Sequence, residues 1–214
     1  MKICVITDIH GHKSSLKKLF DYINIKEFNL LLCCGDITSF GGKQEAKEVL
    51  DLIPHIQFYT LFGNCDTSEV KDYIGSNNIS IHEREVKIQN YTLGGFGGAN
   101  ISPFGTPSEY SEEQLIAGLS KLSYKNMILV THAPPYGTKL DRIGNGKHIG
   151  STSVRDIIER KQPLVALSGH VHESRSIDVI GVTKLLNPGA LKDGYFGIVE
   201  LVNNQVKVEL KELD

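Results

Sequence analysis

Short apolar runs of four to eight residues recur along the chain and predict the strands of a β-sheet. They are "KICVIT" (2–7), "NLLLCC" (29–34), "IQFYTLF" (56–62), "MILVT" (127–131) and "PLVALS" (163–168). Because these runs are apolar at successive positions, they are typical of central strands that are covered on both faces.

Apolar residues recur at helical spacing between the first three runs. One such segment is 14–25, with Ser14 or Ser15 as the expected N-cap. A second is 43–53, and further helices are expected at 111–121 and 151–161. The alternation of strand and helix predicts a β-α-β start to the chain.

The remaining segments alternate apolar and polar residues or are rich in glycine. Alternation in 79–93 and 176–210 predicts half-buried strands, with Asn203-Asn204 as a hairpin turn. The segments 94–100 and 136–151 are predicted to be loops. We infer an α/β fold of two packed sheets flanked by helices. It forms a single domain over residues 1–214.

The composition excludes several classes of protein. Hydrophobic residues make up 40% and charged residues 22%, which is ordinary for a globular chain. The net charge of −2 argues against nucleic-acid binding driven by a basic surface. No segment has the ~20 apolar residues of a membrane helix, and Asp8 stops the N-terminal run too early for a signal peptide. We therefore expect a cytoplasmic protein. The sequence does not indicate its oligomeric state.

Four cysteines are present, and three of them lie in apolar runs: Cys4, Cys33 and Cys34. Their spacing fits neither a zinc motif nor a small disulfide scaffold, so buried, reduced thiols are expected. The fourth, Cys65, stands in "GNCD" where a strand gives way to a loop. Three interpretations are open for it: a catalytic thiol, a metal ligand, or a small packed residue.

Side chains that commonly bind metals follow each of the five apolar runs. In chain order they are Asp8 and His10, then Asp36, then Asn64 with Cys65, then His132, then His170 and His172. Loops beyond the carboxyl ends of the strands in an α/β sheet meet at one crevice, so these side chains are expected to converge. Any one of them alone is more commonly structural, but five such strand ends favour a shared site.

Carboxylate, imidazole and amide donors together suit divalent Mn, Fe or Zn. Each of the pairs Asp8-x-His10 and His170-x-His172 points two donors to the same side of an extended strand end. Seven candidate ligands are more than one tetrahedral zinc needs. They fit two metals about 3.5–4 Å apart that share a carboxylate, as in phosphoryl transfer.

These motifs, in this order, resemble those of the calcineurin-like metallophosphoesterases, and they extend over most of the chain. They are Asp8-x-His10, Gly35-Asp36, Gly63-Asn64-x-Asp66, His132 and Gly169-His170-x-His172. The resemblance implies a double-sheet sandwich flanked by helices, with a metal-bound hydroxide that attacks phosphorus. It implies one metal held by Asp8, His10, Asp36 and His172, and a second held by Asp36, Asn64, His132 and His170.

Cys65 departs from the family pattern, which usually reads Gly-Asn-His-Asp/Glu. That histidine contacts the phosphate and is usually assigned as the proton donor to the leaving oxygen. A thiol, with an ordinary pKa near ~8.5, is a weak donor. Gly-Asn-Cys-Asp resembles a bacterial and archaeal branch of small phosphodiesterases that often prefer manganese. The resemblance thus implies two divalent metal ions, with manganese preferred to Fe, Ni, Zn or Mg. It also implies a small phosphodiester substrate.

His148 lies in the loop before the helix expected at 151–161. We hypothesise that it enters the site and partly replaces the missing imidazole, although a surface-loop histidine is an equally weighted interpretation. Asp66 is expected to steady the loop or a metal-bound water, and Asn64 and Cys65 are placed with it among the catalytic residues.

A metal-dependent phosphodiesterase is the function that these observations favour. A phosphomonoesterase is one alternative, and a non-catalytic metal-binding scaffold of the same fold is another. The seven filled ligand positions argue against a scaffold. A cysteine-based enzyme is disfavoured because Cys65 is not followed by a phosphate-binding loop that ends in arginine.

Overall fold

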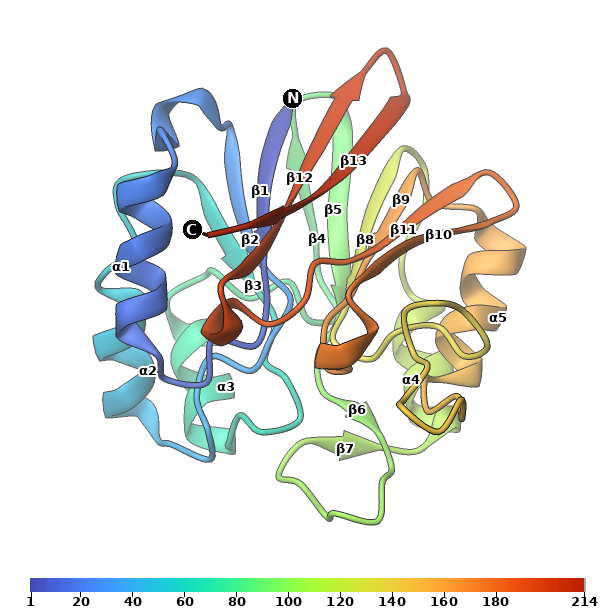
Figure 1. Ribbon diagram of the computed structural model, residues 1–214. Coiled ribbons are helices and arrows are strands. Elements are labelled where there is room, and N and C mark those ends of the chain that lie inside the picture. Colours follow the sequence, from blue (N-terminus) through green and yellow to red (C-terminus); the bar gives the residue numbers. More distant parts are fainter. Residues whose placement is uncertain (214) are drawn as a thin grey trace.

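Two large β-sheets pack face to face in the computed structural model, which describes residues 1–213 (Figure 1). The first sheet has the strand order β13-β12-β1-β2-β3. β1 (Lys2–Ile6), β2 (Leu30–Cys33) and β3 (Phe58–Thr60) are parallel. The hairpin of β12 (Tyr195–Val202) and β13 (Gln205–Glu212) extends this sheet in antiparallel fashion.

The second sheet has the order β10-β11-β9-β8-β5-β4. Its strands are β4 (Glu85–Ile88), β5 (Tyr91–Phe96), β8 (Met127–Thr131), β9 (Val165–Leu167), β10 (Ser176–Ile180) and β11 (Thr183–Asn187). A short parallel pair, β6 (Ala99–Asn100) and β7 (Glu109–Tyr110), lies beyond the lower end of this sheet in Figure 1.

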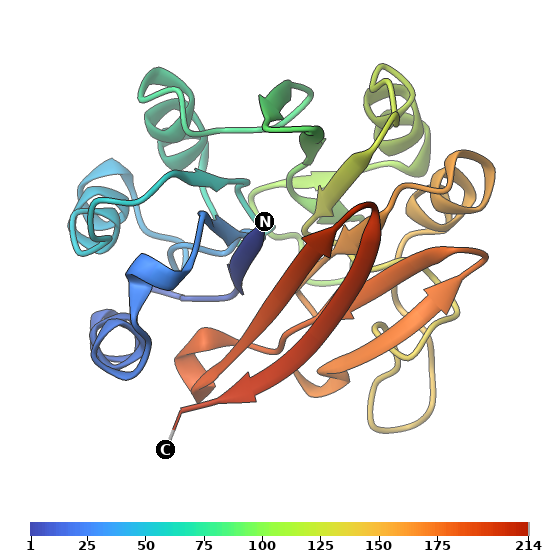
Figure 2. The ribbon, with the colours of Figure 1, turned by 90° about the horizontal axis from the view of Figure 1, so that it is seen from above.

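Helices cover the outer face of each sheet (Figure 2). The first sheet is covered by α1 (Lys13–Tyr22), α2 (Lys43–Leu50) and α3 (Ser68–Ser76), and the second by α4 (Glu112–Leu119) and α5 (Thr152–Lys161). The predicted fold class, an α/β sandwich of two sheets flanked by helices, is confirmed. The single domain over residues 1–214 stays a prediction.

The central strands are apolar on both faces because each face meets a different layer. In β1, Ile3 and Val5 pack between the two sheets, whereas Cys4 and Ile6 pack against the helices. In β8, Ile128 and Val130 pack between the two sheets, whereas Met127 and Leu129 pack against the helices. β3 is an exception, because it is an edge strand rather than a central one. Residues 79–81 pair with Thr60 and cover that edge.

The four predicted helices are present, each with somewhat different ends. The expected serine cap of the first is wrong, because α1 begins at Lys13 with His12 as the N-cap. α3 was not predicted; it is short and buries only Val70 and Ile74 fully. No helix within residues 1–213 is long and apolar enough to cross a membrane.

Both alternating segments contain strands, as predicted, and these strands pair as antiparallel hairpins. Asn203 and Asn204 turn the last hairpin with φ angles of 50° and 63°, the left-handed backbone of a tight hairpin turn. The loop predicted at 94–100 is wrong for five of its seven residues, because 94–96 continue β5 and 99–100 form β6. Glycine is needed there because a Cβ on Gly95 would lie 1.7 Å from the carbonyl oxygen of Val130.

We expect Gly95→Ala to lower the free energy of unfolding by about 1–3 kcal/mol, because the added methyl group overpacks the β5–β8 pair. Gly75→Ala is the matched control, because a Cβ on Gly75 in exposed α3 would have no atom within 4 Å. It should raise stability by about 0.5–1 kcal/mol. Urea unfolding measures both. Equal stabilities for the two variants would contradict the packing argument.

Candidate metal centre

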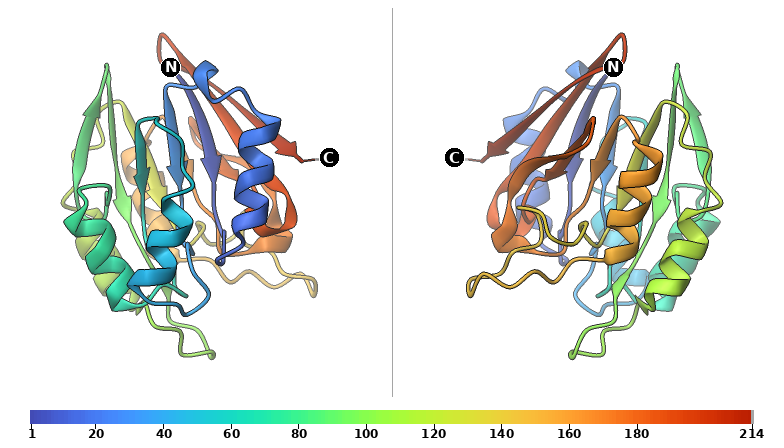
Figure 3. Two further views of the ribbon diagram at one scale, coloured as in Figure 1. Left: turned by 90° about the vertical axis from the view of Figure 1, so that its left-hand side faces the viewer. Right: turned by 90° about the vertical axis from the view of Figure 1, so that its right-hand side faces the viewer.

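Strand ends from both sheets bring the seven predicted metal ligands to one end of the molecule. In the first sheet, Asp8 and His10 follow β1, Asp36 follows β2 and Asn64 follows β3. The second sheet contributes the other three, after β8 and β9: His132, His170 and His172. Figure 3 shows these strands ending at the same, lower end of the sandwich.

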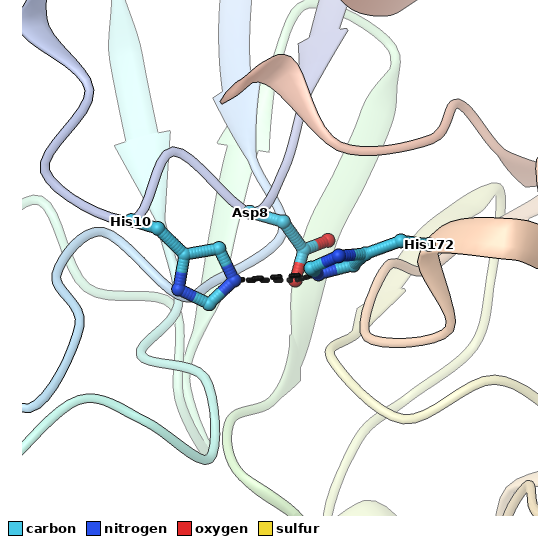
Figure 4. Close-up of side chains that lie close together, drawn as sticks. All are labelled: Asp8, His10 and His172. Atoms are coloured by element: carbon cyan, nitrogen blue, oxygen red, sulfur yellow. Dashed lines mark hydrogen bonds and ion pairs between the residues drawn. The ribbon is translucent and has the colours of Figure 1, made fainter. Parts of the chain in front are cut away.

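Asp8, His10 and His172 form one cluster (Figure 4). Oδ1 of Asp8 lies 3.1 Å from Nε2 of His172 and 3.8 Å from Nε2 of His10. The two Nε2 atoms are 3.3 Å apart. Ligand atoms that bind the same metal ion, each at a distance of about 2.1 Å, lie roughly 3 Å from one another. This cluster therefore has the dimensions of a metal site.

A second cluster lies beside the first and is built around Asn64. Its Oδ1 is 2.9 Å from Nε2 of His132 and 2.8 Å from Nδ1 of His170. Oδ2 of Asp36 is 3.4 Å from Nε2 of His132 and 3.7 Å from Nε2 of His10. Asp36 thus lies between the clusters, which is the position that a shared carboxylate needs.

His132 shows that the second cluster suits a cation. Its Nδ1 donates to the carbonyl oxygen of Cys34 at 2.9 Å. In the neutral ring Nε2 then carries a lone pair, which faces the oxygens of Asn64 and Asp36. Only a proton or a cation makes that contact favourable. Burial lowers the pKa of His132, but the carboxylates of Asp36 and Asp8 outweigh it and raise the pKa to about 9.

Asp8 shows that the first cluster suits a cation as well. Burial opposes its ionisation, but contact with His172 and the charge on His132 lower its pKa. Oδ2 accepts from Oγ1 of Thr7 at 2.7 Å and from the backbone N–H of His170 at 3.1 Å. Oδ1 is buried and has no partner of hydrogen-bond geometry. An ionised, buried oxygen of this kind is satisfied by a metal ion.

The backbone at these strand ends is strained and closely packed. Positive φ angles occur at four of the seven residues: Asp8 (53°), His10 (49°), Asp36 (52°) and His170 (69°). Non-glycine residues in this region are uncommon and gather at functional sites. A Cβ on Gly63 would lie 2.0 Å from Oδ1 of Asp36, and one on Gly169 would lie 2.5 Å from Oδ2 of Asp8. This explains why glycine directly precedes Asn64 and His170.

Asp66 is fully buried and joins the loop that carries Asp36 to the loop that carries Asn64. Each of its oxygens accepts two hydrogen bonds, from the N–H groups of Ile37, Thr38 and Gly63 and from the hydroxyl of Thr38. Burial and the Asp36 carboxylate raise the pKa of Asp66 to about 7, and these donors act in the opposite direction. The sequence left two roles open for Asp66, to steady the loop or to steady a metal-bound water. These hydrogen bonds support the first role.

Cys65 contacts the metal centre mainly through its backbone. Its N–H donates to Oδ1 of Asp36 at 2.8 Å. Its Sγ is grouped with ligand atoms of His10 and Asp36, all within 4.8 Å of one another. Burial and the Asp36 carboxylate raise the pKa of the thiol, which favours the protonated form. The other cysteines, Cys4, Cys33 and Cys34, are buried and free, as predicted.

His148 lies beside the clusters, in the loop between β8 and α5. It lines a cavity of about 610 Å³, here called the side cavity, together with Asn64, His170 and His172. Its Nδ1 lies 2.7 Å from Oδ1 of Asp141. Asp141 is fully buried and also accepts the backbone N–H groups of Gly137, Thr138 and Gly150. The loop thus presents an imidazole that is oriented by a fixed carboxylate.

Sequence reasoning missed Asp141, Thr7 and Ser39. Thr7 bonds to Asp8, and Oγ of Ser39 lies 3.0 Å from Nδ1 of His10. Thr7 directly precedes Asp8, and Ser39 follows Asp36 by three residues. Hydroxyl residues this close to the motifs could have been recognised from the sequence as partners of the ligands. Asp141 gave no such signal, because its pairing with His148 depends on how an irregular loop folds back.

Comparison with known proteins identifies the class of protein to which this chain belongs. The model of the calcineurin-like phosphoesterase family matches residues 1–174, so the chain belongs to this family. Members of the family hydrolyse small phosphorylated substrates with divalent metals, and three groups of side chains here could hold such an ion. A relative, protein MJ1162 of Methanocaldococcus jannaschii, is 41% identical over 196 residues, which is 88% of each chain.

Solved structures share the fold over nearly the whole chain. TT1561 of Thermus thermophilus superposes with a TM-score of 0.79 and 17% identity, over 100% of this chain and 99% of that one. An archaeal phosphodiesterase has a TM-score of 0.58 and 16% identity, over 99% and 100%. A dimetal phosphatase of Danio rerio has a TM-score of 0.67 and 12% identity, over 100% and 96%.

We expect Asp66→Asn to lower the free energy of unfolding by about 1–3 kcal/mol. Each carboxylate oxygen accepts two donors, so the new NH₂ group would face two donors in either orientation. Asp72→Asn, on the exposed face of α3, is the control and should change stability by less than about 0.5 kcal/mol. Chemical denaturation compares them. Similar stabilities would show that Asp66 does not tie the loops together.

Proposed function

We propose that this protein hydrolyses phosphodiesters with two divalent metal ions, of which manganese is preferred to Fe, Ni, Zn or Mg. The observation that carries the proposal is the pair of clusters that meet at Asp36. Their mixture of carboxylate, imidazole and amide atoms is the donor set of such metals. The shared fold with an archaeal phosphodiesterase and with a dimetal phosphatase is consistent with it.

In this proposal each cluster holds one ion. One is held by Asp8, His10, Asp36 and His172, and the other by Asp36, Asn64, His132 and His170. Bound ions would provide positive charge for the phosphate oxygens and lower the pKa of a water molecule. The chain itself fixes the ligands in advance, because the Asp66 hydrogen bonds hold the loops of Asp36 and Asn64 together.

The amide of Asn64 is oriented for this role. Its Nδ2 donates to Oγ1 of Thr106 at 3.1 Å and contacts Sγ of Cys65 at 3.5 Å. Because the nitrogen is engaged on that side, Oδ1 faces the two histidines and is free to act as a ligand. In this proposal Cys65 helps to orient Asn64 and supports Asp36 through its N–H, without a covalent role.

His148 is the proposed proton donor to the leaving oxygen. The carboxylate of Asp141 accepts its Nδ1–H and fixes the orientation of the ring. Hydrolysis adds a water oxygen to phosphorus and breaks the bond from phosphorus to the ester oxygen. The ester oxygen then takes its proton from His148, and the proton lost by water returns to the ring or to solvent.

Two observations favour a diester over a monoester. The motif resemblance aligns the thiol of Cys65 with the family's imidazole, and burial raises the pKa of this thiol, which makes it a poor acid. A monoester leaving group depends more on an acid at that position. In addition, the side cavity opens beside the clusters and has room for a second organic group.

Metal loading tests the proposal directly. Chelator-stripped protein would be reloaded with Mn, Mg, Ni or Zn and assayed with bis(p-nitrophenyl) phosphate and p-nitrophenyl phosphate. We expect two metals per chain by elemental analysis and the highest kcat/KM for the diester with Mn. Asp36→Asn should lower kcat about 10²-fold or more, because it removes the shared ligand charge.

The controls separate the alternatives. Cys65→Ser should keep kcat within about tenfold, since the thiol takes no part in proton transfer. Complete loss in this variant would instead indicate a cysteine enzyme. Less than one metal per chain, with no activity after addition of Mn, would indicate a scaffold. A higher kcat/KM for the monoester would indicate a phosphomonoesterase.

His148→Gln tests the proton donor. For diesters with alkyl leaving groups we expect kcat to fall about 10²–10⁴-fold, because these alkoxides leave only with a proton. The loss should be much smaller for p-nitrophenyl esters, whose phenolate is stable without one. His55→Gln, at an exposed site away from the side cavity, is the matched control. The assignment would be falsified if both ester types lost activity equally, or if neither did.

A further inference from the structure

The side cavity has two unlike walls. One wall is polar and belongs to the metal centre, with Asn64, His170 and His172. The opposite wall comes from the loop between β6 and β7 and from the loop between β8 and α5. Both loops project beyond the lower end of the sheets in Figure 3. Whatever lies in the side cavity is therefore attached to, or next to, the phosphate at the metal centre.

Phe104 is the most exposed aromatic residue of the second wall, with 83% of its surface accessible. Its loop is nevertheless held in place, because Glu109 accepts hydrogen bonds from Ser102 and Thr106. Thr106 also accepts a hydrogen bond from Asn64. A ring presented to solvent by a loop that is bonded to the metal centre is preorganised for a ligand.

Tyr136 lines the same wall and is 42% exposed. Its ring meets the ring of His148 edge to face, with centroids 5.8 Å apart. A group that stacks on Tyr136 thus lies beside the proposed proton donor. Because that donor acts on the leaving oxygen, the alcohol in the side cavity is the leaving alcohol.

Polar groups in the lining of the side cavity distinguish between kinds of alcohol. Asn100, Lys147 and Glu173 lie among the apolar residues. Nδ2 of Asn100 donates to the carbonyl oxygen of Ile149 at 3.3 Å, and Glu173 accepts a hydrogen bond from the backbone N–H of Gly144 at 3.1 Å. An alkyl chain would cover these polar side chains and Lys147 without offering them a hydrogen bond. A flat ring that carries N–H groups can stack on the aromatic side chains and pair with the polar ones.

We propose that the side cavity binds the leaving alcohol of the substrate, and that this alcohol is a nucleoside whose base stacks on Phe104 and Tyr136. The inference rests on the proposed phosphodiesterase activity. It adds the substrate class and the residues that select it.

The test uses the Mn-loaded protein and the methyl ester of adenosine 5′-phosphate. Its two ester bonds lead to primary alcohols of similar basicity, so the products report which group occupies the side cavity. We expect adenosine and methyl phosphate to exceed AMP and methanol at least tenfold. Methyl hexyl phosphate, with an alkyl leaving group of similar basicity, should be hydrolysed at least tenfold less efficiently.

Phe104→Leu keeps an apolar side chain but removes the stacking surface. It should lower kcat/KM for the adenosyl ester about five- to twentyfold and leave the hexyl ester within twofold. Val182→Ala changes an exposed apolar residue in the β10–β11 turn and is the matched control for both esters.

Three results would overturn the inference: equal or better hydrolysis of the hexyl ester, AMP with methanol as the main products, or no effect of Phe104→Leu. If neither ester is hydrolysed, methyl p-nitrophenyl phosphate decides between the two proposals. Hydrolysis of that ester keeps the phosphodiesterase proposal and rejects the nucleoside. Its failure as well rejects the phosphodiesterase proposal itself.

Discussion

Buried acceptor atoms from both sheets face one another around Asp36, and only positive charge stabilises them there. Carboxylates repel each other strongly in a buried, weakly screened space. The histidines cannot relieve this fully, because His132 uses one ring nitrogen on the Cys34 carbonyl. Burial and the charge of His132 lower the pKa of His170 to about 4, which keeps that ring neutral. In our proposal two divalent metal ions supply this positive charge.

The fold holds this repulsive arrangement by constraining the backbone rather than by adding counter-charges. The ligand loops come directly from parallel strands whose positions two apolar layers fix. Close approach of Gly63 to Asp36 and of Gly169 to Asp8 leaves little room for the carboxylates to turn away. Asp66 then ties the loops of the first sheet together. Strain at the strand ends is tolerated because the packed sheets on either side are rigid.

The sequence could predict the layers and the convergence of ligands, since both follow from regular patterns. Apolar runs mark strands, and strand ends of parallel sheets share one edge. What it could not predict depends on irregular structure. β3 appeared central because residues 79–81 cover its edge, and the alternation over 79–93 does not indicate which strand these residues contact. Gly95 appeared to belong to a loop because its close approach to Val130 is a property of the assembled sheet. The Asp141–His148 pair depends in the same way on a folded loop.

The backbone and the side chain of Cys65 play different parts in our proposal. Its backbone N–H still supports Asp36, and this contact does not depend on the side chain. Acid catalysis does depend on the side chain, and in our proposal it has moved to His148 in the β8–α5 loop. The substrate must then bridge the strand ends, where the phosphate binds, and the loops, where the alcohol binds. Because those loops lie outside the packed sheets, their residues can change with the substrate while the metal centre stays the same.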